Sequence, residues 1–187
     1  MKKRIIKLLI WLSVLLNILV VTAIILATTG KLVPLLAPLI TTTMGPKYER
    51  LVSQFEGFTM QSDDVVFLGD SITQGGAWHE LFPNRPIRNR GIGGDTTRGI
   101  LNRLHQVTNG KPSQVFLLIG TNDLNFGETD ETIVDNIITI IEQITYESPD
   151  TQVFVQTILP RSASYQERIE TLNFKICLLY TSDAADE

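Results

Sequence analysis

Three residues in separate polar segments of the sequence could act together on a carboxylic ester. Ser71 supplies a hydroxyl group, Gly94 supplies a backbone N–H that no side chain shields, and Asn122 supplies a side-chain amide. Acyl transfer through a tetrahedral intermediate needs an attacking hydroxyl and several N–H donors aimed at the developing oxyanion. Each residue alone also fits an ordinary role: a helix N-cap, a left-handed turn glycine or an Asx turn. A site therefore requires a fold that brings the three together.

The segments around these residues alternate between strand and helix patterns. Short apolar runs predict strands at residues 65–68, 86–89, 115–119 and 153–155. Apolar residues at helical spacing predict helices that begin near Asp95 or Thr96, near Thr129 or Asp130, and near Ser164. Alternation of this kind predicts an α/β fold, a parallel sheet with helices on both faces.

In such sheets the functional site lies beyond the carboxyl ends of the strands. The segments 69–71, 91–95 and 120–123 each follow a predicted strand. We therefore expect all three bends at one edge of the sheet, where Ser71, Gly94 and Asn122 would meet.

The composition excludes several classes of protein. The chain has 187 residues, 43% of them hydrophobic, with one Cys, two His and a net charge of -4. That apolar content argues against disorder, and a single Cys excludes both an internal disulfide framework and a Cys-rich zinc site. The negative charge, with no long basic run, argues against nucleic acid as the main partner. The length suits one domain.

The N-terminus has the layout of a targeting segment. Four basic residues precede an uncharged apolar run from Leu8 to Ala27, which as a helix would span roughly 30 Å, about the thickness of a bilayer core. We predict a signal anchor in residues 1–30, with a cytoplasmic N-terminus and the rest of the chain outside the cytoplasm. Cleavage near residues 21–23 would instead give a secreted protein. Residues 31–47 form a connector in which Pro34 and Pro38 are expected to break any helix.

Three sequence blocks resemble those of a known enzyme family. F-L-G-D-S-I-T (67–73), N-R-G-I-G-G-D-T-T (89–97) and I-G-T-N-D-L (119–124) are similar to the first three blocks of the SGNH hydrolases, or GDSL esterases/lipases. They are most similar to the branch related to the catalytic subunits of platelet-activating-factor acetylhydrolase. The resemblance implies a three-layer α/β/α, flavodoxin-like domain over residues 48–176.

The resemblance also implies roles for single residues. Ser71 would be the nucleophile and an oxyanion donor, Gly94 the second donor and Asn122 the third. Neither a cofactor nor a metal is implied. The implied substrate is an ester with a small acyl or acetyl group, on a lipid or an acylated carbohydrate.

One family block is missing from the sequence. SGNH hydrolases carry a D-x-x-H near the C-terminus that supplies the general base and its orienting acid, and this chain has none. Its two histidines, His79 and His105, are expected to be surface or core-edge residues and not the base. Two alternatives to the esterase therefore stay open: a non-catalytic binding module that kept the same residues, and an O-acyltransferase acting on cell-envelope polymers.

The last 11 residues, Cys177–Glu187, match the translation of a common transposase sequencing adapter at every position. We therefore expect this tail to be translated adapter and the natural gene to continue past Ile176. The SGNH-like domain would then be incomplete at its C-terminus, and the chain as given would be a crippled enzyme.

Overall fold

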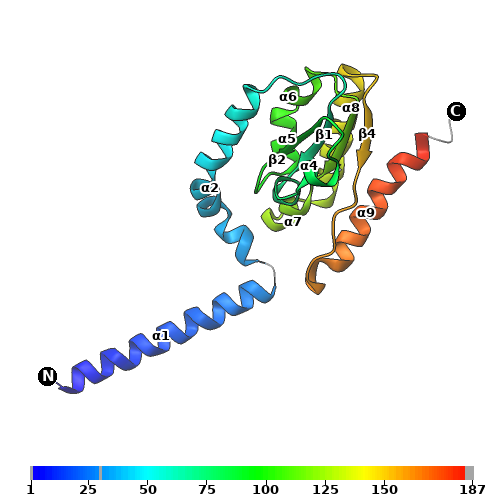
Figure 1. Ribbon diagram of the computed structural model, residues 1–187. Helices are drawn as coiled ribbons and strands as arrows, with labels where there is room; N and C mark the ends of the chain where they lie inside the picture. Colours follow the sequence, from blue (N-terminus) through cyan, green and yellow to red (C-terminus); the bar gives the residue numbers. More distant parts are fainter. Residues whose placement is uncertain (1, 30, 184–187) are drawn as a thin grey trace.

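The structure, a computed structural model, describes residues 2–29 and 31–183 of the chain (Figure 1). The four strands are β1 (Val65–Gly69), β2 (Ile87–Gly91), β3 (Gln114–Leu118) and β4 (Gln152–Val155). The helices before β3 are α1 (Lys2–Thr28), α2 (Leu32–Glu56), α3 (Ser71–Gln74), α4 (Trp78–Leu81), α5 (Thr97–Arg103) and α6 (His105–Thr108). Those after β3 are α7 (Thr121–Phe126), α8 (Asp130–Glu147) and α9 (Ala163–Asp183). The predicted strands are confirmed within two residues, and the helix predicted from residue 95 or 96 is divided into α5 and α6.

The four strands form one parallel sheet in the order β2-β1-β3-β4. Val65 of β1 pairs with Ile87 of β2 and with Gln114 of β3, which in turn pairs with Gln152 of β4. This register aligns the carboxyl ends of all four strands, as the sequence predicts.

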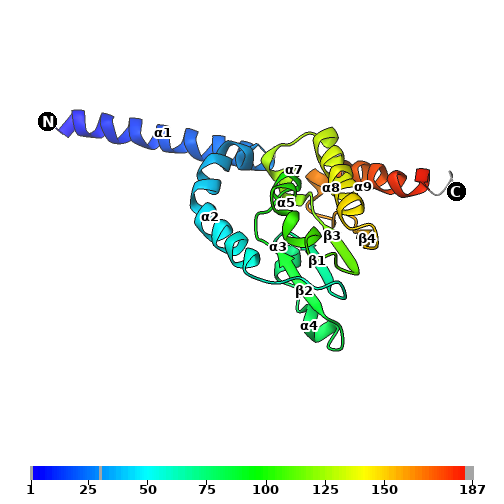
Figure 2. The same cartoon turned by 90° about the horizontal axis from the view of Figure 1, so that it is seen from above.

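One face of the sheet forms the main hydrophobic core. Val66 and Leu68 of β1 and Val115 and Leu117 of β3 are completely buried against residues of α5 to α9. Helix α8 contributes a buried stripe at 3.6-residue spacing, made of Ile133, Ile137, Ile140 and Ile144. Helices α8 and α9 lie side by side (Figure 2).

The other face is covered only in part by the described residues. It carries a row of stacked rings: Phe67 stacks on Trp78 at 4.0 Å between ring centroids and on Phe116 at 5.0 Å, and Phe116 stacks on Phe154 at 4.8 Å. Only the short helices α3 and α4 lie over this face, and Phe154 is 41% exposed. The expected three-layer arrangement is thus present on one face and incomplete on the other.

Helix α2 corrects the prediction for residues 31–47. The chain is helical from Leu32 to Glu56, so Pro34 and Pro38 do not prevent a helix there. The reason is that Pro34 falls in the first turn, where backbone N–H groups have no partner within the helix, while Pro38 removes a single hydrogen bond. The connector and the start of the domain are therefore one continuous helix.

Helix α1 projects away from the domain (Figure 1). Its segment Arg4–Thr28 is long and apolar enough to cross a membrane, and none of its most apolar window is buried within the protein. A core helix of a soluble domain would pack its apolar side chains, so this helix does not serve the core.

Candidate active site

Ser71 lies where β1 ends and α3 begins. The Asp70 carboxylate caps α3, because its Oδ1 accepts a hydrogen bond from the Ile72 N–H at 2.8 Å. Ser71 is the first helical residue and is exposed. The N-cap role that Ser71 could have filled therefore belongs to Asp70, and the Ser71 hydroxyl remains at the surface of the sheet edge.

The bend after β2 packs directly against α3. The Gly93 N–H donates to Gln74 Oε1 at 2.8 Å, and a Cβ built on Gly93 would lie 3.8 Å from the Ser71 Cβ. Gly94 has a φ of 83°, in the left-handed region that favours glycine. The second predicted bend thus adjoins the first, with Gly94 one residue from the contact with Ser71.

The bend after β3 packs against the second bend. Asn122 Nδ2 donates to the Asp95 backbone carbonyl at 2.8 Å. The Asp123 carboxylate accepts from the Thr97 N–H at 3.1 Å and from its hydroxyl at 2.6 Å. These bonds hold the start of α7 against the start of α5, and they use one of the two protons on the Asn122 amide nitrogen.

The three bends therefore adjoin one another at the carboxyl edge of the sheet. The Ser71 and Gly94 backbone N–H groups donate to no other described residue. With the second Asn122 proton, they give three N–H donors available to a ligand near an exposed hydroxyl. That arrangement has the groups that stabilise an oxyanion during attack on a carbonyl.

A buried arginine that the sequence analysis missed ties the bends together. Arg103 contacts Asp95 Oδ2 at 2.7 Å and donates to the Arg90 carbonyl at 2.8 Å and the Gly69 carbonyl at 3.3 Å. One guanidinium thus joins the ends of β1 and β2 to the bend that carries Gly94. Tyr48 of α2 adds a hydrogen bond to Asp95 Oδ1 at 3.1 Å. The only signal in the sequence was a charged residue among the apolar positions of a helix.

Burial sets the electrostatics of this edge. It raises the pKa of the Asp70, Asp95 and Asp123 carboxyls, in each case chiefly through desolvation. For Asp70 the backbone N–H of Ile72 and the charge of Arg161 act in the opposite direction. The Tyr48 hydroxyl, which lies beside Asp95, has a pKa raised to about 12 by burial and by that carboxylate.

Arg161 also lies at this edge and was not singled out from the sequence. Its Nη1 donates to the Thr121 carbonyl at 3.1 Å and to Asn125 Oδ1 at 2.8 Å. The guanidinium lies over the Tyr165 ring, 4.8 Å from its centroid. These contacts fix the segment that follows β4 next to α7.

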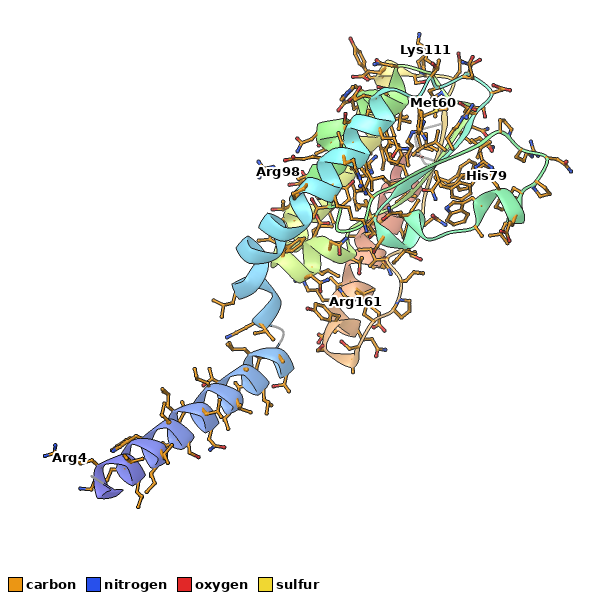
Figure 3. The ribbon with its side chains drawn as sticks, turned by 60° about the vertical axis from the view of Figure 1, so that its left-hand side comes forward. Arg4, Met60, His79, Arg98, Lys111 and Arg161 are labelled. Atoms are coloured by element: carbon orange, nitrogen blue, oxygen red, sulfur yellow. The ribbon has the colours of Figure 1, made fainter. Side chains whose placement is uncertain are left out.

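Neither histidine lies at the site. His105 Nε2 contacts Glu56 Oε1 at 2.7 Å, on α6, which runs away from the carboxyl edge. His79 is exposed on α4 and lines a surface hollow with Ile87 and Arg88 (Figure 3). Within the described residues no cluster of three His, Cys, Asp or Glu side chains could hold a metal ion.

Comparison with known proteins gives the same assignment. Residues 67–176 match the model of the GDSL-like lipase/acylhydrolase family. The chain belongs to this family. Members of the GDSL/SGNH hydrolases are typically serine esterases, and the matched segment contains all three bends.

Two kinds of relative support the family assignment. The chain is 36% identical over 123 residues to the alpha2 subunit of platelet-activating factor acetylhydrolase IB from Homo sapiens, an alignment that covers 60% of this chain. It spans only 53% of that relative's length. Among solved structures, it is similar to a candidate platelet activating factor of Streptococcus pneumonia, with a TM-score of 0.68, 25% identity and coverage of 79% of this chain and 76% of the other.

A candidate acylhydrolase of Bacteroides fragilis matches with a TM-score of 0.62 and 25% identity over 73% of each chain. The parallel sheet and its order are thus those of GDSL hydrolase structures.

Proposed function

We propose that this protein is a membrane-anchored serine esterase that hydrolyses a carboxylic ester with a small acyl or acetyl group. The observation that carries the proposal is the meeting of the exposed Ser71 hydroxyl with the unpaired N–H groups of Ser71 and Gly94 and the second amide proton of Asn122. Family membership and the relatives named above support the same reaction class.

In the proposed reaction, Ser71 Oγ attacks the ester carbonyl and its proton passes to a general base. The carbonyl oxygen becomes an oxyanion held by the three N–H donors, and each such donor typically contributes about 10²–10³ to the rate. Collapse of the intermediate releases the alcohol with the proton from the base and leaves an acyl-Ser71 ester. Water, activated by the same base, then releases the acid and restores the hydroxyl.

The base is the part of this machinery that the described residues do not supply. We propose that it comes from a D-x-x-H block encoded after Ile176 and that residues 177–187 are translated adapter. A serine without its base is a weak nucleophile. Removal of the histidine from a serine-protease triad lowers kcat by about 10⁶, so the chain as given should show almost no turnover.

We further propose that α1 holds the protein in the cell membrane with its N-terminus in the cytoplasm. Its length, its lack of packing against the domain and the four basic residues that precede or begin the apolar segment support this topology. The esterase domain would then lie outside the cytoplasm.

The test compares this chain with a longer one in which the sequence encoded after Ile176 in the source genome replaces residues 177–187. With p-nitrophenyl acetate, we expect an acyl-enzyme burst from the longer chain, its loss in Ser71→Ala, and a rate about 10²–10³ lower in Asn122→Ala. The 187-residue chain should give no Ser71-dependent burst.

Each unexpected result has a distinct meaning. A burst from the 187-residue chain would show that the base is already present in it. A longer chain that carries D-x-x-H, folds and yet gives no burst would contradict the esterase and favour a binding module.

A further inference from the structure

Helix α2 runs along the domain from one edge of the sheet to the other. Near its end, Glu56 contacts His105, and the Val52 carbonyl accepts from Gln106 Nε2 at 3.1 Å. Helix α6, which carries both partners, ends next to Met60 and so lies near the amino ends of the strands. The C-terminal part of α2 is therefore at the edge opposite the site.

Tyr48 marks the level of the site along α2. Its hydroxyl donates to Asp95, the residue that follows Gly94, so this part of α2 lies at the carboxyl edge. From Tyr48 back to Leu32 the helix continues for 16 residues, about 24 Å. The N-terminal half of α2 thus projects beyond the edge that carries Ser71.

Helix α1 joins the chain at that same end. Figure 3 shows Arg161 at the end of the domain nearer to α1, with Met60 and Lys111 at the far end. In Figure 1 the start of α9 and the junction of α1 with α2 lie at the same end of the molecule. The carboxyl edge therefore faces the side from which the proposed anchor leaves.

The sequence of the projecting half suits a membrane surface. Residues 32–40 contain no charged side chain, and nine helical residues cover about 13 Å. If this stretch lies in the interfacial layer, residues 41–47 hold the site about 10 Å above it. The carboxyl edge also exposes Ile72 and Leu159, by 40% and 46%. Charge does not single out this edge, because Glu128 is exposed there as well as Arg161.

We propose that the Ser71 edge faces the bilayer that holds α1, and that the ester reaches Ser71 from the surface of that bilayer. The substrate is then a membrane lipid ester and not a soluble acylated carbohydrate. This inference rests on the anchor in the proposed function, and it adds a direction and a substrate class.

The test measures orientation and needs no turnover. In a Cys177→Ser background, a bimane fluorophore is attached to Ser162→Cys at the carboxyl edge or, as the matched control, to Ser62→Cys at the amino edge; both serines are exposed. The protein is placed in phosphatidylcholine/phosphatidylglycerol vesicles that contain headgroup-nitroxide lipid. We expect a large loss of fluorescence at position 162 and little at position 62.

A second variant checks that α2 sets the distance. Seven residues inserted between Thr42 and Thr43 add about two turns, roughly 10 Å, with little rotation of the domain. Quenching at position 162 should then fall toward the level at position 62. In the longer chain, the same insertion should slow hydrolysis of a vesicle-embedded ester and leave that of p-nitrophenyl acetate unchanged.

The failures are distinguishable. Protein that does not float with vesicles contradicts the anchor and this inference with it. Protein that floats but is quenched equally at both positions, or more at position 62, overturns the inference alone. Equal slowing on both esters would contradict a membrane-derived substrate.

Discussion

The two faces of the sheet are built from the same four strands but differ in how completely the chain covers them. On one face Leu117 is fully buried beneath helices, whereas on the other Phe154 is 41% exposed. Both sides of each strand are apolar because a parallel sheet expects cover on both faces. The difference teaches that the site bends depend mainly on the covered face, where α5, α7 and α8 pack, and that the other face has apolar surface still available for contact.

The largest effect is expected from the covered face. Leu117→Ala should lower the free energy of unfolding by about 3 kcal/mol, because a fully buried leucine leaves a cavity that the surrounding helices cannot fill. Denaturant unfolding in a mild detergent, followed by circular dichroism, measures the change. A loss below about 1 kcal/mol would show that this core is loosely packed.

An intermediate effect is expected where the other face is partly covered. Trp78 stacks on Phe67, and its Nε1 donates to the Thr73 carbonyl at 2.8 Å. Trp78→Ala should cost about 2 kcal/mol, less than a fully buried tryptophan, because Trp78 is only half-buried. The same unfolding experiment tests this value, and Trp78→Phe, which keeps the stacking, serves as the control.

The smallest effect on folding is expected at the open end of the ring row. Phe154→Thr should change the free energy of unfolding by no more than about 0.5 kcal/mol, because exposed side chains contribute little. It should also reduce self-association, since it removes an exposed ring from an edge strand. Sedimentation velocity gives the second readout. A cost comparable to that of Leu117→Ala would mean that the two faces are equally buried in solution.

The sequence predicts the strands and the meeting of the bends well, because both follow from local patterns. The apolar run 115–119 is too short for a helix and stops at Gly120, whose φ of 117° requires glycine. Parallel strands then place their carboxyl ends together, so Ser71, Gly94 and Asn122 could be expected at one edge before any coordinates existed.

The sequence predicts the long-range contacts poorly. Arg103 looks like a surface residue of a helix until the Gly69 and Arg90 carbonyls are seen to converge on it. Helix α2 was missed because two prolines outweighed the remaining helical pattern, although a proline in the first turn costs little. Arg161 gave no local signal at all, since its partners Thr121 and Asn125 lie about 40 residues earlier.

The position of Arg103 has a consequence for how this protein could diversify. Its partners are two strand-end carbonyls and one aspartate, and it touches neither the 75–86 loop nor the turn after α7. Those outer loops can accept insertions and substitutions while the nucleophile and its donors keep their relative positions. New ester preferences could therefore arise by exchanging the loops around a scaffold that one buried cation keeps constant.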